Sequence, residues 1–272
     1  VVIFFIMAFQ PKINIVNIEN NNQNINIANT PSPIATKDNK AYNSDKKYKI
    51  SFKIQPKVMF GENRSEIVSF DTFVDTRSVV KYGTTANYGI TSEFPEYKTH
   101  HEIILADLDP NTRYYYSVSI YSDNGGFNEG YSSYFTTKSS IQYQYSFAVM
   151  GDSRPVTGFI MPKEFHELIQ LIARKIPNFG IIVGDMVQLS DISTITNNDA
   201  EMAWKNFTDA ILPISSKVPI YLAVGNHDEP TNPVSLKTYR ELWTFPRNGG
   251  GKSGWYDETT YWFNYSNSLF IV

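Results

Sequence analysis

Three apolar runs in this sequence each end in a glycine that is followed at once by a polar residue able to bind a metal ion. The runs are Phe147–Met150 before Gly151-Asp152, Ile181–Val183 before Gly184-Asp185, and Ile220–Val224 before Gly225-Asn226-His227-Asp228. In an open α/β sheet, ligands and reactants bind just beyond the carboxyl ends of the strands. We therefore expect three consecutive strands to bring two carboxylates, an amide oxygen and an imidazole into one crevice.

Composition narrows the classes of protein to which the chain can belong. Its 272 residues allow two ordinary domains or one large one, and the apolar fraction of 42% is ample for real cores. The net charge of −3 gives no basic surface of the kind that nucleic-acid binding needs, so we expect no nucleic-acid partner. The chain has no cysteine, which excludes disulfides and thiolate metal sites.

The first 45 residues do not have the pattern of a folded domain. Residues 1–9 are uncharged and almost wholly apolar, a length that suits the hydrophobic region of a clipped signal peptide. We therefore expect an exported protein, located in a periplasm, secreted or at a cell surface. A buried strand or a piece of a longer apolar segment are the alternatives. Residues 10–45 are rich in Asn and are predicted to be a linker.

Residues 46–138 are predicted to form an all-β domain. Apolar and polar residues alternate from Tyr48 to Gln55 and again from Tyr114 to Ile120, the period of half-buried strands. Further strands are expected at 67–73, 78–82, 101–105 and 132–136, and short strands at this spacing favour a β-sandwich. The stretch Leu105–Tyr116 resembles the end of a fibronectin type III-like module, in which a tyrosine after the turn locks the corner.

Residues 139–272 alternate between strand and helix patterns, which predicts a layered α/β domain. Apolar residues at helical spacing between Phe165 and Ile172 predict one helix, closed by Pro177. A second helix is expected over Ala200–Ile211, stopping before Pro213. The last segment, from 260 to 272, is expected to form two strands around Ser266-Asn267.

The polar residues at the three strand ends have the chemistry of a metal site. Asp152 and Asp185 are hard oxygen ligands, Asn226 offers a carbonyl oxygen, and His227 is either a ligand or a proton donor. Such a set suits two divalent ions about 3.5–4 Å apart. We expect the preceding glycines to let the chain turn sharply and to leave space for the ions. Two alternatives stay open for Asp152: a helix or turn cap after its strand, and a structural ion pair with Arg154.

At these residues the chain resembles the calcineurin-like metallophosphoesterases, which carry the same three motifs in the same order. A fibronectin-like module ahead of the catalytic domain is similar to the purple acid phosphatase branch of that family. The resemblance implies that Asp152 binds the first metal, that Asp185 bridges both metals and that Asn226 binds the second. It also implies that His227 protonates the leaving oxygen and that Asp228 helps to orient the motif, so we count both among the catalytic residues.

Two positions depart from the family pattern. Arg154 stands where the family has His or Gly, and although an arginine cannot bind a metal, its planar fork suits a phosphate, so we count it among the catalytic residues. Gln188 stands where the purple branch has the tyrosine that colours its ferric ion. We therefore predict no ferric–tyrosinate absorption.

The histidines that complete the family's metal shells have no counterpart in the sequence. Its four histidines are His100, His101, His166 and His227, and the first two lie in the β-rich part. We therefore expect residues 139–272 to correspond to the front half of a metallophosphoesterase domain. A chain of this extent would bind its metals weakly and be a poor catalyst.

Together these observations predict a metal-dependent hydrolase of phosphate esters that uses a hydroxide activated by two metals. The expected cofactors are two divalent or mixed-valence ions (Fe, Mn or Zn), only partly liganded by this chain, and the expected substrate is a small phosphate ester or a nucleotide. A pyrophosphatase or nucleotidase would use the same chemistry. The alternative is a non-catalytic surface binding protein with a degenerate phosphoesterase domain, in which the β module contacts a protein or a surface.

Overall fold

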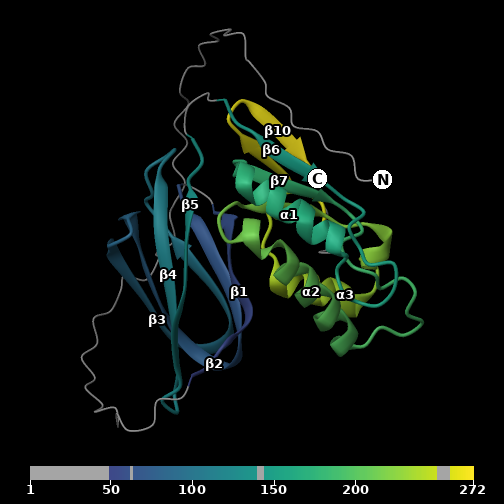
Figure 1. The fold of residues 1–272 in the computed structure, drawn as a ribbon, viewed down its shortest axis with the longest axis horizontal. Coiled ribbons are helices and arrows are strands. Elements are labelled where there is room, and N and C mark those ends of the chain that lie inside the picture. The colour runs from purple at the N-terminus through teal and green to yellow at the C-terminus, as the bar shows by residue number, and fades with distance from the viewer. Residues whose placement is uncertain (1–48, 62–63, 140–143, 250–257) are drawn as a thin grey trace.

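The computed structural model describes residues 49–61, 64–139, 144–249 and 258–272, which form a β-rich part followed by an α/β part (Figure 1). The predicted signal segment and linker, residues 1–45, lie outside the described residues. Among the described helices, none has the length and apolar character needed to cross a membrane.

The β-rich part is a curled antiparallel sheet of five strands. They are β1 (Phe52–Phe60), β2 (Glu66–Thr85), β3 (Tyr88–Leu105), β4 (Arg113–Ser122) and β5 (Phe127–Thr136). The strand order is β1-β2-β4-β5, and β3 also pairs with β2. The two strands expected at 67–73 and 78–82 are one continuous strand, so that prediction was wrong. The register between β2 and β3 is irregular between Asp71 and Thr76, and this lets β2 pair with β1 on one side of the irregularity and with β4 on the other.

A tyrosine closes the turn between β3 and β4. The hydroxyl oxygen of Tyr114 accepts a hydrogen bond from the backbone N–H of Asp109 at 3.0 Å, and the ring is buried. This is the corner contact that the sequence stretch predicted. The curled sheet encloses its own core of alternate inward-facing residues, while the fibronectin-like topology stays a prediction.

The α/β part is built on a parallel sheet in the order β6-β7-β8. Its elements are β6 (Phe147–Met150), α1 (Lys163–Lys175), β7 (Phe179–Val183), α2 (Asn197–Ser215), β8 (Ile220–Ala223), the 3-10 turn η1 (Asn226–Asp228), α3 (Pro233–Leu242), and the antiparallel hairpin of β9 (Trp262–Tyr265) and β10 (Ser268–Ile271). The α/β class, the first helix and the terminal hairpin are therefore as predicted.

Two helices differ from the sequence prediction. Helix α2 continues past Pro213 to Ser215, because the proline lies in the last turn and the buried side chains of Ile214 and Ser215 keep the chain on the core. Helix α3 was not predicted. Its signal was Asn232, whose side chain caps the helix, followed by Pro233 in the first turn.

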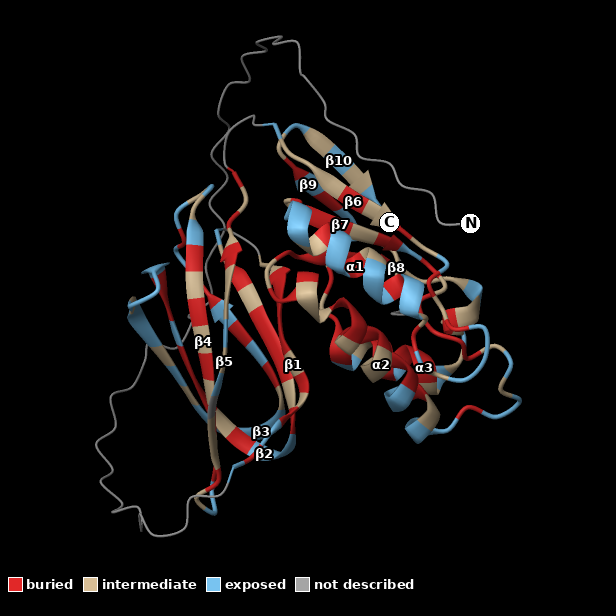
Figure 2. Cartoon of the chain, in the orientation of Figure 1, coloured by how far each residue is buried: buried red, intermediate tan, exposed pale blue. Residues whose placement is uncertain are grey.

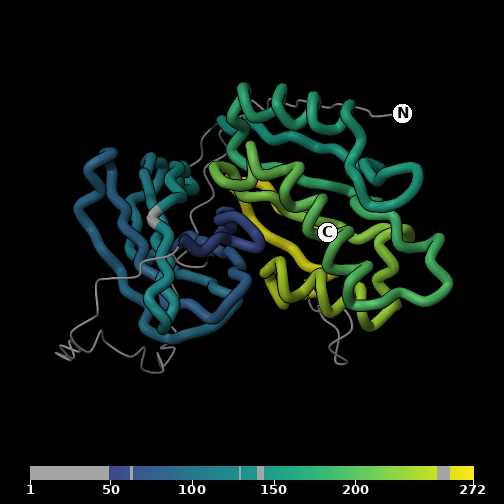
Figure 3. The backbone as a smooth tube through the Cα atoms, turned by 60° about the horizontal axis from the view of Figure 1, so that its bottom comes forward, coloured from purple at the N-terminus to yellow at the C-terminus, as the bar shows by residue number. Residues whose placement is uncertain are grey.

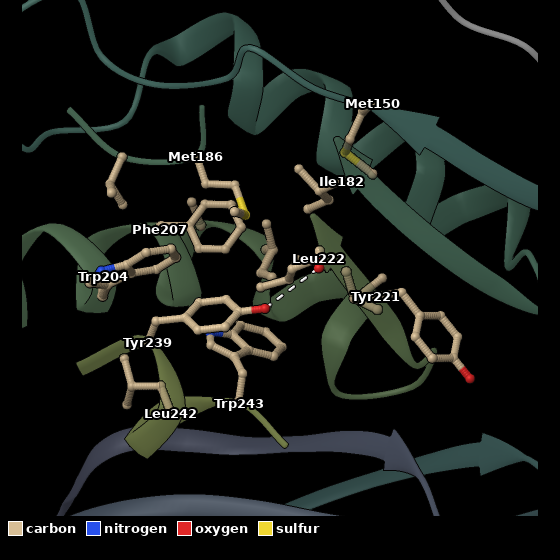
Figure 4. Close-up of a cluster of buried hydrophobic side chains, with 14 of the residues drawn as sticks. Met150, Ile182, Met186, Trp204, Phe207, Tyr221, Leu222, Tyr239, Leu242 and Trp243 are labelled. Carbon is tan, nitrogen blue, oxygen red and sulfur yellow. Dashed lines mark hydrogen bonds between the residues drawn. The ribbon is translucent and has the colours of Figure 1, made fainter. Parts of the chain in front are cut away.

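Aromatic side chains fill the core of the α/β part. Trp204, Phe207, Tyr239 and Trp243 pack between α2, α3 and the sheet, and the Tyr239 hydroxyl points toward the carbonyl oxygen of Leu222 (Figure 4). Beside this cluster, rings of the β9–β10 hairpin pack on Phe147 and Phe179. Buried residues occur on the strands and helices of the α/β part (red in Figure 2), and they form one apolar core.

Strand β1 of the β-rich part lies against the α/β part (purple in Figure 3). Its residues Ile54 and Met59 belong to the core of the α/β part and not to that of the β-rich part. The Nζ of Lys57 is buried, donates to the Ser69 hydroxyl at 3.1 Å, and lies 5.1 Å from the ring centroid of Trp243. The β-rich part is therefore packed against the α/β part through apolar and polar contacts.

A charged cluster of the β-rich part faces the same junction. The Nδ1 of His100 donates to Asp71 at 2.7 Å, its Nε2 lies 3.6 Å from Glu102, and Glu102 accepts a hydrogen bond from Thr244 of the α/β part. The hydrogen bonds to Asp71 and Glu102 raise the pKa of His100 from 6.5 to about 9. The protonated imidazole therefore stabilises the folded state.

This raised pKa predicts a pH dependence of stability. The contribution of His100 is fully present below pH 6.5 and is lost as the pH rises through about 9. We expect the free energy of unfolding of the wild type to fall, relative to that of His100→Gln, by less than about 1 kcal/mol over this range, since the pair is partly exposed. Urea unfolding at both ends of the range measures it, with His166→Gln on the exposed face of α1 as control. Parallel pH curves for wild type and His100→Gln would contradict the assignment.

Candidate metal centre

The three Gly-polar segments lie at one edge of the parallel sheet, with the end of β7 in the middle. Backbone hydrogen bonds tie them together. The N–H of Asp152 donates to the carbonyl of Gly184 at 3.0 Å, and the N–H of Arg154 donates to the carbonyl of Asp185 at 2.8 Å. On the other side, the N–H of His227 donates to Oδ1 of Asp185 at 3.1 Å. Backbone hydrogen bonds thus join the first two strand ends, and the Asp185 carboxylate joins the third, so the predicted convergence of the strand ends is present.

Both aspartates adopt the left-handed backbone conformation as the chain leaves its strand. The φ angle is +53° at Asp152 and +54° at Asp185. Aspartate tolerates this region better than most residues, and strained backbone of this kind is concentrated at functional sites. We expected the glycines to form the sharp turn after each strand. In the structure, the aspartate that follows the glycine also adopts a turn conformation.

The glycines at these strand ends allow close approach of neighbouring chain and do not leave open space. A Cβ atom on Gly225 would lie 2.2 Å from Oδ1 of Asp185, and one on Gly151 would lie 2.8 Å from the carbonyl oxygen of Val183. The prediction that these glycines leave room for ions was wrong at both positions. The space is taken by the adjacent strand end, which keeps Asp185 close to β8.

Side chains from all three segments meet around Asp185. Nε of Arg154 lies 3.8 Å from Oδ1 of Asp152 and 3.8 Å from Oδ2 of Asp185, and Nε2 of His227 lies 4.0 Å from the same Oδ2. Asp152 is the most accessible of the four, with 64% of its side chain exposed against 20% for Asp185. The ion pair of Arg154 with Asp152, left open by the sequence, is present and extends to Asp185.

Two further polar residues support this group, and the sequence did not assign them a role. Nη1 of Arg154 donates to Oε1 of Gln188 at 2.6 Å, and Nε2 of Gln188 donates to the hydroxyl of Ser190 at 3.1 Å. The Ser190 oxygen lies 2.5 Å from Nδ1 of His227. A chain of hydrogen bonds therefore runs from Arg154 to His227 and leaves Nε2 of His227 facing Asp185. No spacing in the sequence indicates the role of Ser190.

Asp228 fixes the loops that carry the other residues. Its carboxylate accepts four backbone hydrogen bonds, from the N–H groups of Asp185, Met186, Val187 and Gly225, at 2.8–3.0 Å. The side chain is buried, and this burial raises its pKa to about 6, although the backbone donors act in the opposite direction. The predicted role in orienting the motif fits this geometry, whereas direct contact with a substrate does not.

Asn226 is exposed at the start of η1, beside this group. In the part of the chain that the structure describes, no hydrogen bond or ion pair joins its side chain to Asp152 or Asp185, and no three His, Cys, Asp or Glu side chains already surround a common ion position. The donors have the chemistry that hard divalent ions prefer. As the side chains stand, however, Arg154 lies between the two carboxylates that would hold such an ion.

A cavity elsewhere in the structure does not coincide with the group around Asp185. A cavity of about 760 Å³ lies where the β-rich and α/β parts meet, lined among others by Met59, Ile67, Tyr221, Phe245 and Trp262. It contains none of the predicted site residues. We therefore identify the candidate site by the chemistry of its side chains and not by the presence of a large cavity.

Comparison with known proteins finds a family similarity in the α/β part. Residues 145–271 match the family model of calcineurin-like phosphoesterases. The matched segment contains all six predicted site residues.

The relatives include purple acid phosphatases. The chain is 30% identical over 161 residues to "Probable inactive purple acid phosphatase 9" of Arabidopsis thaliana, covering 56% of this chain and 23% of the relative. It is 25% identical over 176 residues to "Purple acid phosphatase 23" of the same plant, covering 56% of this chain and 36% of the relative. The chain thus spans about a quarter to a third of the length of these two proteins.

Solved structures show the same fold. Purple acid phosphatase PPD1 from yellow lupin (Lupinus luteus) seeds superposes with a TM-score of 0.60 at 16% identity, covering 79% of this chain and 43% of that one. PhoD superposes with a TM-score of 0.62 at 11% identity, covering 82% and 52%. Both matches extend over more of the chain than the family segment, so the likeness in fold includes residues of the β-rich part.

Proposed function

We propose that this protein is a metal-dependent hydrolase of phosphate esters. The observation that carries the proposal is the meeting of Asp152, Asp185 and His227 at the ends of three parallel strands, within the segment that matches the phosphoesterase family. The names of the curated relatives, purple acid phosphatases, agree with it.

The donor set fits divalent ions chemically. Asp152, Asp185 and Asn226 would supply the oxygen ligands of two ions, with Fe, Mn and Zn as the candidates. When bound, the ions activate water as a nucleophile and neutralise charge on the phosphoryl group. The exposed carboxylate of Asp152 is open to an ion arriving from solvent, whereas Asp185 is held in place by its contact with the N–H of His227.

The other residues of the group have separate roles in the proposal. His227 protonates the leaving oxygen through Nε2, because its Nδ1 is engaged with Ser190. Arg154 binds a non-bridging phosphoryl oxygen, for which its planar guanidinium is well suited. Asp228 acts as a positioning residue that holds the loops after β7 and β8.

The substrate proposed is a small phosphate ester or a nucleotide, handled outside the cytoplasm by an exported protein. The acidic balance of the chain gives no reason to expect nucleic acid as a partner. The β-rich part is proposed to contact a protein or a surface.

A second candidate is a non-catalytic binding protein with a degenerate phosphoesterase domain. The position of Arg154 between the carboxylates favours it, because an arginine there already compensates their charge. The name of one relative, "Probable inactive purple acid phosphatase 9", points in the same direction.

The two candidates are separated by hydrolysis of an aryl phosphate in the presence of Mn²⁺ or Zn²⁺. The assay uses the product of the whole reading frame that contains this sequence. We expect metal-dependent turnover that falls by at least about 100-fold in Asp185→Asn, which keeps the size of the side chain but removes its charge. Asp75→Asn, an exposed carboxylate of the β-rich part, is the matched control. Absence of metal-dependent turnover in a folded wild type would favour the binding protein.

A further inference from the structure

The guanidinium of Arg154 occupies the position of a cation between two carboxylates. Its Nε is equidistant from Asp152 and Asp185, at 3.8 Å from an oxygen of each. The two carboxylates carry two negative charges, of which the arginine compensates one. The positive charge of Arg154 therefore lies where a metal ion would lie if these two carboxylates formed a metal site.

The arginine is held there by charge more than by hydrogen bonds. Among the residues that the structure describes, Nη1 donates to Gln188 at 2.6 Å, whereas the buried Nε has no hydrogen-bond partner. A buried N–H without an acceptor is costly, and a separation of 3.8 Å is too long for a hydrogen bond. The side chain is thus attracted to the carboxylates but not locked onto them by paired hydrogen bonds.

We infer that Arg154 is a built-in competitor of the metal: its guanidinium neutralises Asp152 and Asp185 when no ion is bound, and it must withdraw before a divalent cation binds between them. This inference rests on the proposed function, because it concerns the same site. It gives Arg154 two successive positions, on the carboxylates without metal and on the phosphoryl group of a substrate.

The test is the affinity for Mn²⁺, measured from the electron paramagnetic resonance signal of the free ion. In Arg154→Gln the competing charge is gone, so we expect Mn²⁺ to bind at least about tenfold more tightly than to the wild type, which corresponds to about 1.4 kcal/mol. Arg174→Gln is the matched control, because it removes the same charge from the last turn of α1, at the opposite edge of the sheet. It should bind Mn²⁺ as the wild type does.

Thermal unfolding gives a second readout. In chelator, Arg154→Gln leaves two carboxylates without a counter-charge, so its melting temperature should lie below that of the wild type. With saturating Mn²⁺ the order should reverse. If Arg154→Gln does not fold, Gln188→Ala takes its place, since loss of the Nη1 acceptor loosens the arginine and should raise Mn²⁺ affinity by a smaller factor.

Equal or weaker Mn²⁺ binding by these variants would overturn the inference, because Arg154 would then support the metal or be indifferent to it. The proposed function fails in a different way, by Mn²⁺ binding without turnover of a phosphate ester in any of the proteins. Tighter binding in Arg154→Gln supports the inference in either case.

Discussion

Replacing Asp228 by alanine is expected to lower the free energy of unfolding by about 4 kcal/mol or more, because four backbone N–H groups lose their acceptor at once and each unsatisfied buried group costs roughly 1–3 kcal/mol. The four donors belong to Gly225 and to the three consecutive residues from Asp185 to Val187, so both strand-end loops lose their anchor. Urea unfolding of the variant in chelator, compared with that of the wild type, measures the loss.

Asp228→Asn tests the same contacts with a milder change of the side chain. Its amide keeps one carbonyl oxygen as acceptor and turns an NH₂ group toward the remaining donors, so we expect a destabilisation between those of wild type and alanine variant. Asp75→Asn and Asp75→Ala, at an exposed position, should leave the unfolding curve almost unchanged. If Asp228→Ala unfolds at the same urea concentration as the wild type, the carboxylate does not anchor the loops.

The sequence was sufficient to predict which strands meet at the site. Each run before Asp152, Asp185 and Asn226 is short, apolar and followed by glycine. Because the carboxyl ends of parallel strands lie on the same side of a sheet, this pattern predicts where the three residues meet. The local pattern also predicted the terminal hairpin, and the resemblance of the stretch Leu105–Tyr116 to a fibronectin-like module predicted the tyrosine corner. These features are specified by residues close to one another in the chain.

The parts that escaped prediction depend on residues far apart in the chain. Whether Gly225 makes room for an ion or for the Asp185 side chain is decided by the distance between β7 and β8, which a single sequence does not contain. The same holds for Ser190, whose partner His227 lies 37 residues further along the chain. Strand β2 was divided in the prediction, whereas in the structure the strand continues from Glu66 to Thr85 across a change of register in its pairing with β3 between Asp71 and Thr76.

The position of Arg154 shows how far a resemblance can be carried. Motif matching places this residue next to the predicted metal ligands, and its charge suggests contact with a phosphate. The structure adds that Arg154 forms ion pairs with the carboxylates of two of these residues, Asp152 and Asp185. For a residue that departs from a family pattern, the pattern therefore predicts its location in the site better than it predicts which group it contacts.

The proposed proton transfer by His227 makes the largest kinetic prediction. We expect His227→Ala to lower kcat for an alkyl phosphate by about 10²–10⁴-fold, the usual contribution of a general acid, because an alkoxide leaves poorly without a proton. For a nitrophenyl phosphate, whose leaving group is stable as an anion, the loss should be much smaller. Steady-state kinetics with both substrates, at fixed metal concentration, give the two ratios.

The difference between the two substrates separates general acid catalysis from a structural role. A variant that merely distorts the site would lose both activities in equal proportion, and this result would contradict the assignment. Ser190→Ala is the informative companion, since it removes the partner of Nδ1 and leaves the imidazole in place. It should show the same dependence on the leaving group with a smaller loss. Asp228 contributes to neither ratio directly, because its carboxylate is committed to backbone N–H groups and has none of the exposure of Asp152.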